Sequence, residues 1–159
     1  MRKNNQIIPY ELWDIEELSA EDRALVEAAK SATAQSYAPY SAFHVGSALR
    51  LSTGDIYTGN NQENASYPCG TCAERALLHY VQANFPQKSI NAMAIAAETK
   101  GNFTQMPLPP CGLCRQALLE AEQRQQKNIS LLMYGTKQVL IVRSIAHLLP
   151  FQFNSELLA

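Results

Sequence analysis

The chain has 159 residues, of which 47% are hydrophobic and 17% charged, and this predicts one compact domain around a single core. Thirteen basic and fourteen acidic residues leave a net charge of -1, and no basic run is longer than Arg2-Lys3, which argues against a nucleic-acid partner. No apolar stretch is long enough to cross a membrane and the first ten residues lack the apolar core of a signal peptide, so we expect a cytoplasmic protein without a membrane partner.

The first part of the chain predicts a helix followed by a hairpin. Ser19 is typical of a helix N-cap, and it opens a run of apolar residues at helical spacing that should end before Pro39. Residues 43–49 alternate between apolar and more polar side chains, and residues 56–58 form a second short run. Because Gly54-Asp55 lies between the two runs, they are interpreted as the strands of a β-hairpin.

The second part alternates between helical and strand patterns. Apolar residues recur at helical spacing over residues 73–81, and residues 90–97 form a continuous apolar strand. A second helical pattern follows over residues 113–121, and a second strand over residues 129–134. A strand, a helix and a strand in this order predict a parallel crossover.

The last predicted strand, residues 139–142, follows a connection that is too short for another crossover, so it should run antiparallel to its neighbour. Together these patterns predict an α/β fold with three layers, α/β/α. A mixed sheet of five strands should lie between the helices.

The cysteines provide the strongest chemical signal. Cys72, Cys111 and Cys114 each fall at the start of a predicted helix, where free N–H groups and the helix dipole stabilise a thiolate. In a reducing compartment such thiolates are metal ligands more often than disulfides. Three thiolates would leave the fourth tetrahedral position of a zinc ion open, which is the arrangement of a catalytic site.

Two charged residues follow these cysteines closely. Glu74, two residues after Cys72, can approach a water on the metal without binding the metal, so it is a candidate proton shuttle. Arg115, next to Cys114, is expected to hydrogen bond to the thiolates and to offset their negative charge.

A structural zinc site remains an alternative. Cys69 and Cys72 form one Cys-x-x-Cys pair and Cys111 and Cys114 form another, so Cys69 could close the metal as a fourth thiolate in a zinc-stabilised binding module. The two pairs are farther apart than the ~15–20 residues of compact zinc ribbons.

Four motifs in order resemble the cytidine deaminase family. Residues 72–75 (CAER) and 110–116 (PCGLCRQ) look like its metal-binding motifs. Upstream, residues 37–46 (YAPYSAFHVG) are similar to its first strand, and residues 61–67 (NQENASY) to its nucleoside-binding loop.

The resemblance implies roles for single residues. Asn61 and Glu63 match the pair that hydrogen bonds to the ribose 3'-hydroxyl, and Phe43 matches the aromatic residue that packs on the base. Ala73 would donate its backbone N–H to the pyrimidine O2. Glu74 would contact N3 and the amino group.

The reaction implied by the resemblance is hydrolytic deamination of cytidine and 2'-deoxycytidine, as part of pyrimidine salvage. One Zn²⁺ per chain would activate the water that attacks C4. A deaminase of a cytosine-containing antibiotic is the alternative within the same chemistry, and the intact loop at Asn61, Glu63 and Asn64 argues against it.

The C-terminal segment resembles that of the small tetrameric members of the family. In these, an aromatic residue that matches Phe153 closes over the site of a neighbouring subunit, so a homotetramer is implied. The matched region leaves residues 1–18 as an N-terminal extension and residues 19–159 as the single domain.

Overall fold

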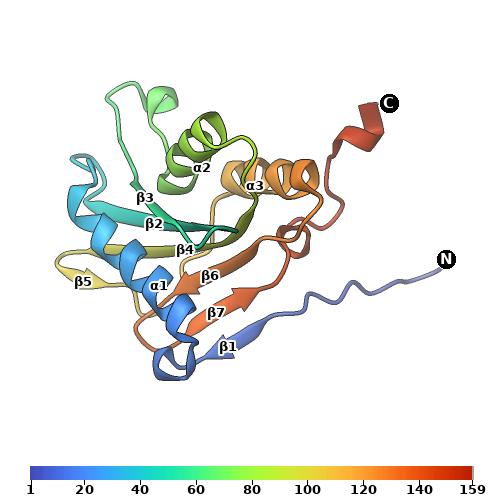
Figure 1. Ribbon diagram of the computed structural model, residues 1–159, viewed down its shortest axis with the longest axis horizontal. Coiled ribbons are helices and arrows are strands. Elements are labelled where there is room, and N and C mark those ends of the chain that lie inside the picture. Colours follow the sequence, from blue (N-terminus) through green and yellow to red (C-terminus); the bar gives the residue numbers. More distant parts are fainter. Residues whose placement is uncertain (159) are drawn as a thin grey trace.

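The computed structural model describes residues 1–158; Ala159, the last residue of the expected domain, lies outside the described residues. One mixed sheet is covered by helices on both faces (Figure 1). Its helices and strands are β1 (Glu11–Trp13), α1 (Ala20–Ala32), β2 (Phe43–Leu51), β3 (Ile56–Asn60), α2 (Ala73–Asn84), β4 (Ile90–Thr99), β5 (Asn102–Phe103), α3 (Gly112–Gln125), β6 (Ser130–Tyr134) and β7 (Val139–Val142). Three short 3₁₀ turns lie between these elements, namely η1 (Ile15–Glu17), η2 (Thr33–Gln35) and η3 (Tyr67–Cys69). Two more follow β7, namely η4 (Ile145–Leu148) and η5 (Ser155–Leu158).

The sheet has seven strands in the order β1-β7-β6-β4-β2-β3, with β5 paired to β4. The parallel pair β4 and β6 and the antiparallel last strand β7 confirm the predicted topology. The expected count of five strands is wrong because β1 and β5 add to it. These two strands have three and two residues, which is too short for an alternating pattern to be recognised.

Two apolar cores lie on opposite faces of the sheet, which confirms the three-layer arrangement (Figure 1). Helix α1 packs on one face through Leu25, Val26 and Ala29. Helices α2 and α3 pack on the other face, against Met93 and Ile95 of β4. All three predicted cysteine ligands belong to the layer formed by α2 and α3.

Helix α1 begins where the sequence predicts, because the Ser19 hydroxyl accepts a hydrogen bond from the Asp22 backbone N–H at 3.1 Å. It then lies very close to β2. A Cβ atom at Gly46 would come within 2.1 Å of the Ala29 carbonyl oxygen, so only glycine allows this approach.

Part of the N-terminal extension is built into the fold. Strand β1 pairs with β7 and forms one edge of the sheet, and its Glu11 carboxylate binds the guanidinium of Arg143 through two contacts of 2.9 and 2.6 Å. Leu18 is only 6% exposed and packs in the core beneath α1. The boundary between residues 18 and 19 therefore stays a prediction, which a truncation can test.

Within residues 1–158, no helix combines the length and apolarity needed to cross a membrane.

Candidate active site

The first turns of α2 and α3 bring three sulfur atoms together. Cys72 is the N-cap residue of α2 and Cys111 that of α3, and both have extended backbone conformations. Neither side chain caps its own helix, so both sulfurs are free to point across the gap between the two helices. Cys114 lies one turn into α3 and is fully buried.

The sulfur positions fit a tetrahedral metal ion. The Sγ atoms of Cys72 and Cys111 are 3.8 Å apart, and those of Cys111 and Cys114 are 3.5 Å apart. Zinc with Zn–S bonds of ~2.3 Å needs a separation of about 3.8 Å between tetrahedral thiolates. Among the described residues, these three form the cluster that could hold a metal, and Cys69 is outside it. The arrangement therefore favours a three-thiolate site with an open fourth position over the four-thiolate alternative.

The cluster already favours a thiolate. A hydrogen bond from Cys114, helped by nearby Arg75, lowers the pKa of Cys72 to about 5. The same contact with Cys72, together with burial, raises the pKa of Cys114. A divalent cation would favour the ionised form of all three sulfurs.

Glu74 lies beside the cluster and is buried. Its side chain is only 4% exposed, and burial raises the pKa of its carboxyl group above the usual value. Ala73, the first residue of α2, is fully buried and lines the same cavity. A carboxyl group that binds a proton more tightly than usual is suited to hold that proton between two steps.

The arginine beside the thiols is Arg75. Although burial opposes it, the nearby sulfurs of Cys72 and Cys114 raise the pKa of Arg75. Arg115 was expected in this position, but its Nε donates to the Pro110 carbonyl at 2.9 Å and its Nη1 to the Leu148 carbonyl at 3.1 Å. Arg75 is three residues after Cys72 and shares its face of α2, whereas the carbonyls of Pro110 and Leu148 hold the guanidinium of Arg115.

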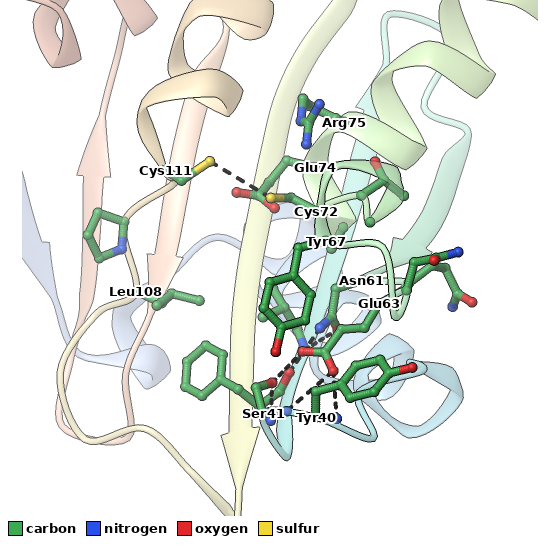
Figure 2. Close-up of a pocket in the computed structure, with 18 residues that line it drawn as sticks. Tyr40, Ser41, Asn61, Glu63, Tyr67, Cys72, Glu74, Arg75, Leu108 and Cys111 are labelled. Carbon is green, nitrogen blue, oxygen red and sulfur yellow. Dashed lines mark hydrogen bonds between the residues drawn. The ribbon is translucent and has the colours of Figure 1, made fainter.

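A cavity of about 790 Å³ opens in front of the cysteines, within the range of small-molecule sites. Figure 2 shows the sulfurs of Cys72 and Cys111 and the Glu74 carboxylate at one end, and Asn61 and Glu63 at the other. The wall between the two ends is largely apolar and includes Phe43, Val45, Leu108 and Pro109.

The far end of the cavity is held by the segment that leads into β2. The Asn61 amide donates to the Phe43 carbonyl at 2.9 Å and accepts from the Val45 N–H at 2.8 Å. The Glu63 carboxylate accepts from the hydroxyl of Ser41 and from the backbone N–H of Tyr40. These hydrogen bonds hold the pKa of Glu63 below its usual value, and the one from Ser41 has the largest effect.

Several cavity residues were not anticipated from the sequence. Tyr40, Ser41 and Tyr67 line its open end, and the rings of Tyr40 and Tyr67 meet edge to face at 6.1 Å. The i, i+3 spacing from Cys72 could have identified Arg75. No local pattern links Ser41 to Glu63, because 22 residues separate them.

Three predicted site residues do not line the cavity. Cys114 is buried in the sulfur cluster, and Arg115 binds the carbonyls of Pro110 and Leu148. The third is Phe153. Its side chain is 58% exposed, and its backbone carbonyl accepts a hydrogen bond from Gln116 of α3. The remaining predicted residues, namely Phe43, Asn61, Glu63, Cys72, Ala73, Glu74 and Cys111, all line the cavity.

Comparisons with known proteins agree with this geometry. A sequence model of the cytidine and deoxycytidylate deaminase zinc-binding region matches residues 19–129. The cytidine deaminase of Sporosarcina psychrophila is 37% identical over 145 residues, which cover 90% of this chain and 93% of that protein. The cytidine deaminase of Halalkalibacterium halodurans is 36% identical over 132 residues, which cover 83% of this chain and 93% of that protein.

Solved structures show the same similarity. The crystal structure of cytidine deaminase from Burkholderia pseudomallei has a TM-score of 0.70 and 38% identity, and the match covers 82% of this chain and 97% of that one. The cytidine deaminase from Mycobacterium tuberculosis has a TM-score of 0.66 and 31% identity, with 86% of this chain and 99% of that one covered.

Proposed function

Because this chain belongs to the cytidine and deoxycytidylate deaminase family, we propose that it hydrolyses cytidine and 2'-deoxycytidine to uridine and 2'-deoxyuridine with release of ammonia. One observation carries the proposal. A single cavity has three clustered thiols and a buried carboxyl group at one end and a polar amide and carboxylate pair at the other. This is the polarity that a nucleoside needs, with the base at the thiols and the sugar at the polar pair.

Cys72, Cys111 and Cys114 hold one zinc ion per chain, consistent with the spacing of their sulfurs. When bound there, zinc supplies the Lewis acid that activates a water molecule for attack at C4 of the pyrimidine. Arg75 offsets part of the negative charge that three thiolates bring to the site.

Glu74 moves the protons. It takes a proton from the attacking water and delivers it to N3 of the pyrimidine. It then carries a second proton, from the hydroxyl now bonded to C4, to the amino group, which leaves as ammonia while the C4 carbonyl forms. Its burial supports this role, because the raised pKa of its carboxyl group lets the residue hold a proton between the two transfers. The low exposure also keeps bulk water away from the shuttle.

The remaining residues orient the nucleoside. Phe43 packs on the base, and the Ala73 N–H at the start of α2 donates to the pyrimidine O2. Asn61 and Glu63 bind the ribose 3'-hydroxyl through the hydrogen-bonding capacity that their contacts with residues 40–45 leave free. A contact at the 3' position leaves both ribose and deoxyribose acceptable.

The charge of the cavity favours a nucleoside over a nucleotide. Among the described residues that line it, Arg75 is the only basic one, and it lies beside the thiols. The open end carries the Glu63 carboxylate, whose low pKa keeps it ionised. A 5'-phosphate would therefore meet a negative charge without a partner.

The experiment follows the ultraviolet absorbance of cytidine, 2'-deoxycytidine and cytidine 5'-monophosphate with the purified protein. Zinc per chain is counted in the parent, in Glu74→Gln, and in Glu120→Gln as a matched change on an exposed position of α3. The two nucleosides should be converted by the parent and by Glu120→Gln, and by Glu74→Gln only at a background rate although it holds its zinc. A parent that binds one zinc but leaves both nucleosides unchanged would refute the proposed substrate.

The protein is a cytoplasmic homotetramer of pyrimidine salvage in this proposal, and Phe153 closes the cavity of a neighbouring subunit. The high exposure of Phe153 and its absence from its own cavity support this role. Co-expression of Phe153→Ala with Glu74→Gln tests it. Mixed assemblies should contain sites with an intact Glu74 from one chain and an intact Phe153 from the other. Activity no higher than the sum of the two variants alone would exclude a shared site.

A further inference from the structure

Of the three candidate zinc ligands, Cys111 is the least buried. Cys114 is fully buried inside α3, and the Cys72 side chain is partly buried at the start of α2, whereas Cys111 is exposed. The segment between β5 and α3 contains three prolines and forms no regular hydrogen-bonded element. Some other contact must therefore fix the backbone of Cys111.

Arg115 provides this contact on both sides of Cys111. Its backbone N–H donates to the Cys111 carbonyl at 3.0 Å, as the first turn of any helix would require. Its side chain adds what helix geometry alone does not supply, because Nε donates to the carbonyl of Pro110 at 2.9 Å. The peptide groups before and after Cys111 are thus both held by one residue.

The other arm of the guanidinium reaches the turn η4. Nη1 of Arg115 donates to the Leu148 carbonyl, at the end of η4. The start of η4 is fixed by Glu122, which is only 6% exposed and accepts from the Ser144 hydroxyl at 2.6 Å and from the Ile145 N–H at 2.9 Å. Glu122 lies seven residues after Arg115, so both side chains project from one face of α3.

We propose that Arg115 is a positioning residue for the metal centre: its guanidinium joins the carbonyl that precedes Cys111 to the end of η4, a short turn whose start Glu122 fixes, and this holds the Cys111 sulfur in ligand geometry. The proposal rests on the zinc site of the proposed function. A planar guanidinium can satisfy two carbonyls in a fixed geometry, whereas a lysine ammonium acts as a point charge on a flexible stem. Arginine and lysine should therefore differ at this position.

The test compares zinc-loaded Arg115→Ala and Arg115→Lys with the parent. Arg124→Ala is the matched control, because it removes the same charge from the last turn of the same helix. The rate of zinc transfer to a chromogenic chelator is measured well below the unfolding temperature of each protein. Zinc should leave Arg115→Ala at least tenfold faster than the parent, Arg115→Lys at an intermediate rate, and Arg124→Ala at the parental rate.

A spectroscopic readout separates positioning from general destabilisation. With Co²⁺ in place of zinc, the sulfur-to-metal absorption bands of Arg115→Ala should weaken or shift, because one thiolate is no longer held in place. Those of Arg124→Ala should match the parent.

Parental zinc release by a folded Arg115→Ala would overturn the proposal. If Arg115→Ala does not fold, the comparison of Arg115→Lys with Arg124→Ala decides. Equal rates of zinc release from these two variants would overturn the proposal. These rates need no turnover. A parent that holds zinc but deaminates no nucleoside would refute the substrate and leave the comparison intact, whereas a parent that binds no zinc would overturn both.

Discussion

The side-chain amide of Asn61 donates a hydrogen bond to the backbone carbonyl of Phe43 at 2.9 Å. The same amide accepts from the N–H of Val45, so it bridges two residues at the start of β2. The residue proposed to bind the sugar and the residue proposed to pack on the base are therefore parts of one hydrogen-bonded unit. A change at Asn61 should disturb both ends of the substrate.

Replacement of Asn61 by alanine should lower kcat/KM for cytidine by roughly 10-fold to 100-fold, since it removes the sugar contact and two hydrogen bonds that position Phe43. Steady-state assays with 3'-deoxycytidine divide the two effects. This substrate lacks the contacted hydroxyl, so the loss on substitution should be smaller for it than for cytidine. Equal losses for the two substrates would mean that Asn61 acts only through the backbone of β2.

Substitution of Glu74 by glutamine should stabilise the protein while it removes turnover. Burial raises the pKa of this carboxyl group, so its ionised form is unfavourable in the folded state above that pKa. A neutral side chain of the same shape avoids this, and the melting temperature of the zinc-free protein should rise by about 2–4 °C for each kcal/mol gained. The gain should be larger at pH 8 than at pH 5, where the parent carboxyl group is protonated more often. A lower melting temperature at both pH values would contradict the argument.

The ion pair between Glu11 and Arg143 should make stability depend on acid pH. Hydrogen bonding to Arg143 lowers the pKa of Glu11 from 4.5 to about 2. Because the folded-state pKa is the lower one, the contribution is complete above pH 4.5 and is lost as the pH falls toward 2. Both side chains are partly exposed, so the contribution at pH 7 should not exceed about 1 kcal/mol.

Urea unfolding of the parent and of Glu11→Gln at several pH values measures this contribution. The two proteins should differ at pH 7 and converge near pH 2, and 1 M salt should reduce the difference at pH 7. A difference that stays constant between pH 7 and pH 2 would assign the effect to packing of β1 and not to charge.

Truncation tests the boundary of the N-terminal extension. A chain that starts at Tyr10 keeps β1 and should melt at the same temperature as the parent. A chain that starts at Ser19 lacks β1 and the buried side chain of Leu18, and its melting temperature should fall by roughly 5–10 °C. Equal melting temperatures for all three chains would show that the domain does begin at residue 19.

Much of the fold could be predicted because its helices and central strands carry strong periodic patterns. The hairpin of β2 and β3 and the short connection before β7 were recognisable from turn residues and connection length. Strand β1 was not, because its pairing depends on β7, which is more than a hundred residues away in the chain. A three-residue strand forms only where a partner edge is already in place.

The metal end of the site was more predictable than the sugar end. Cys72 and Cys111 follow loops and precede helices, so local patterns place them at helix starts. The partners of Glu63 come from a distant segment, and only the tertiary structure brings Tyr40 and Ser41 to it. The two arginines show the same limit, because proximity in sequence to Cys114 favoured Arg115, whereas the backbone carbonyls that bind it are set by the packing of η4.

Where α1 packs on β2 and β4, the sheet carries only glycine and alanine side chains. Gly46 pairs with Ala96, and Ala48 pairs with Ala94, so this face is nearly flat and α1 lies close to it. Substitutions should therefore have different effects on the two faces of the sheet. At Gly46, Ala48, Ala94 and Ala96 any larger side chain overpacks, at about 1–3 kcal/mol each. The face beneath α2 and α3 is built from large side chains, so substitutions there leave voids that let the helices bearing the cysteines shift. Substitutions that reduce side-chain volume beneath α2 and α3 should thus lower activity. Substitutions that add volume between α1 and strands β2 and β4 should lower the stability of the fold alone.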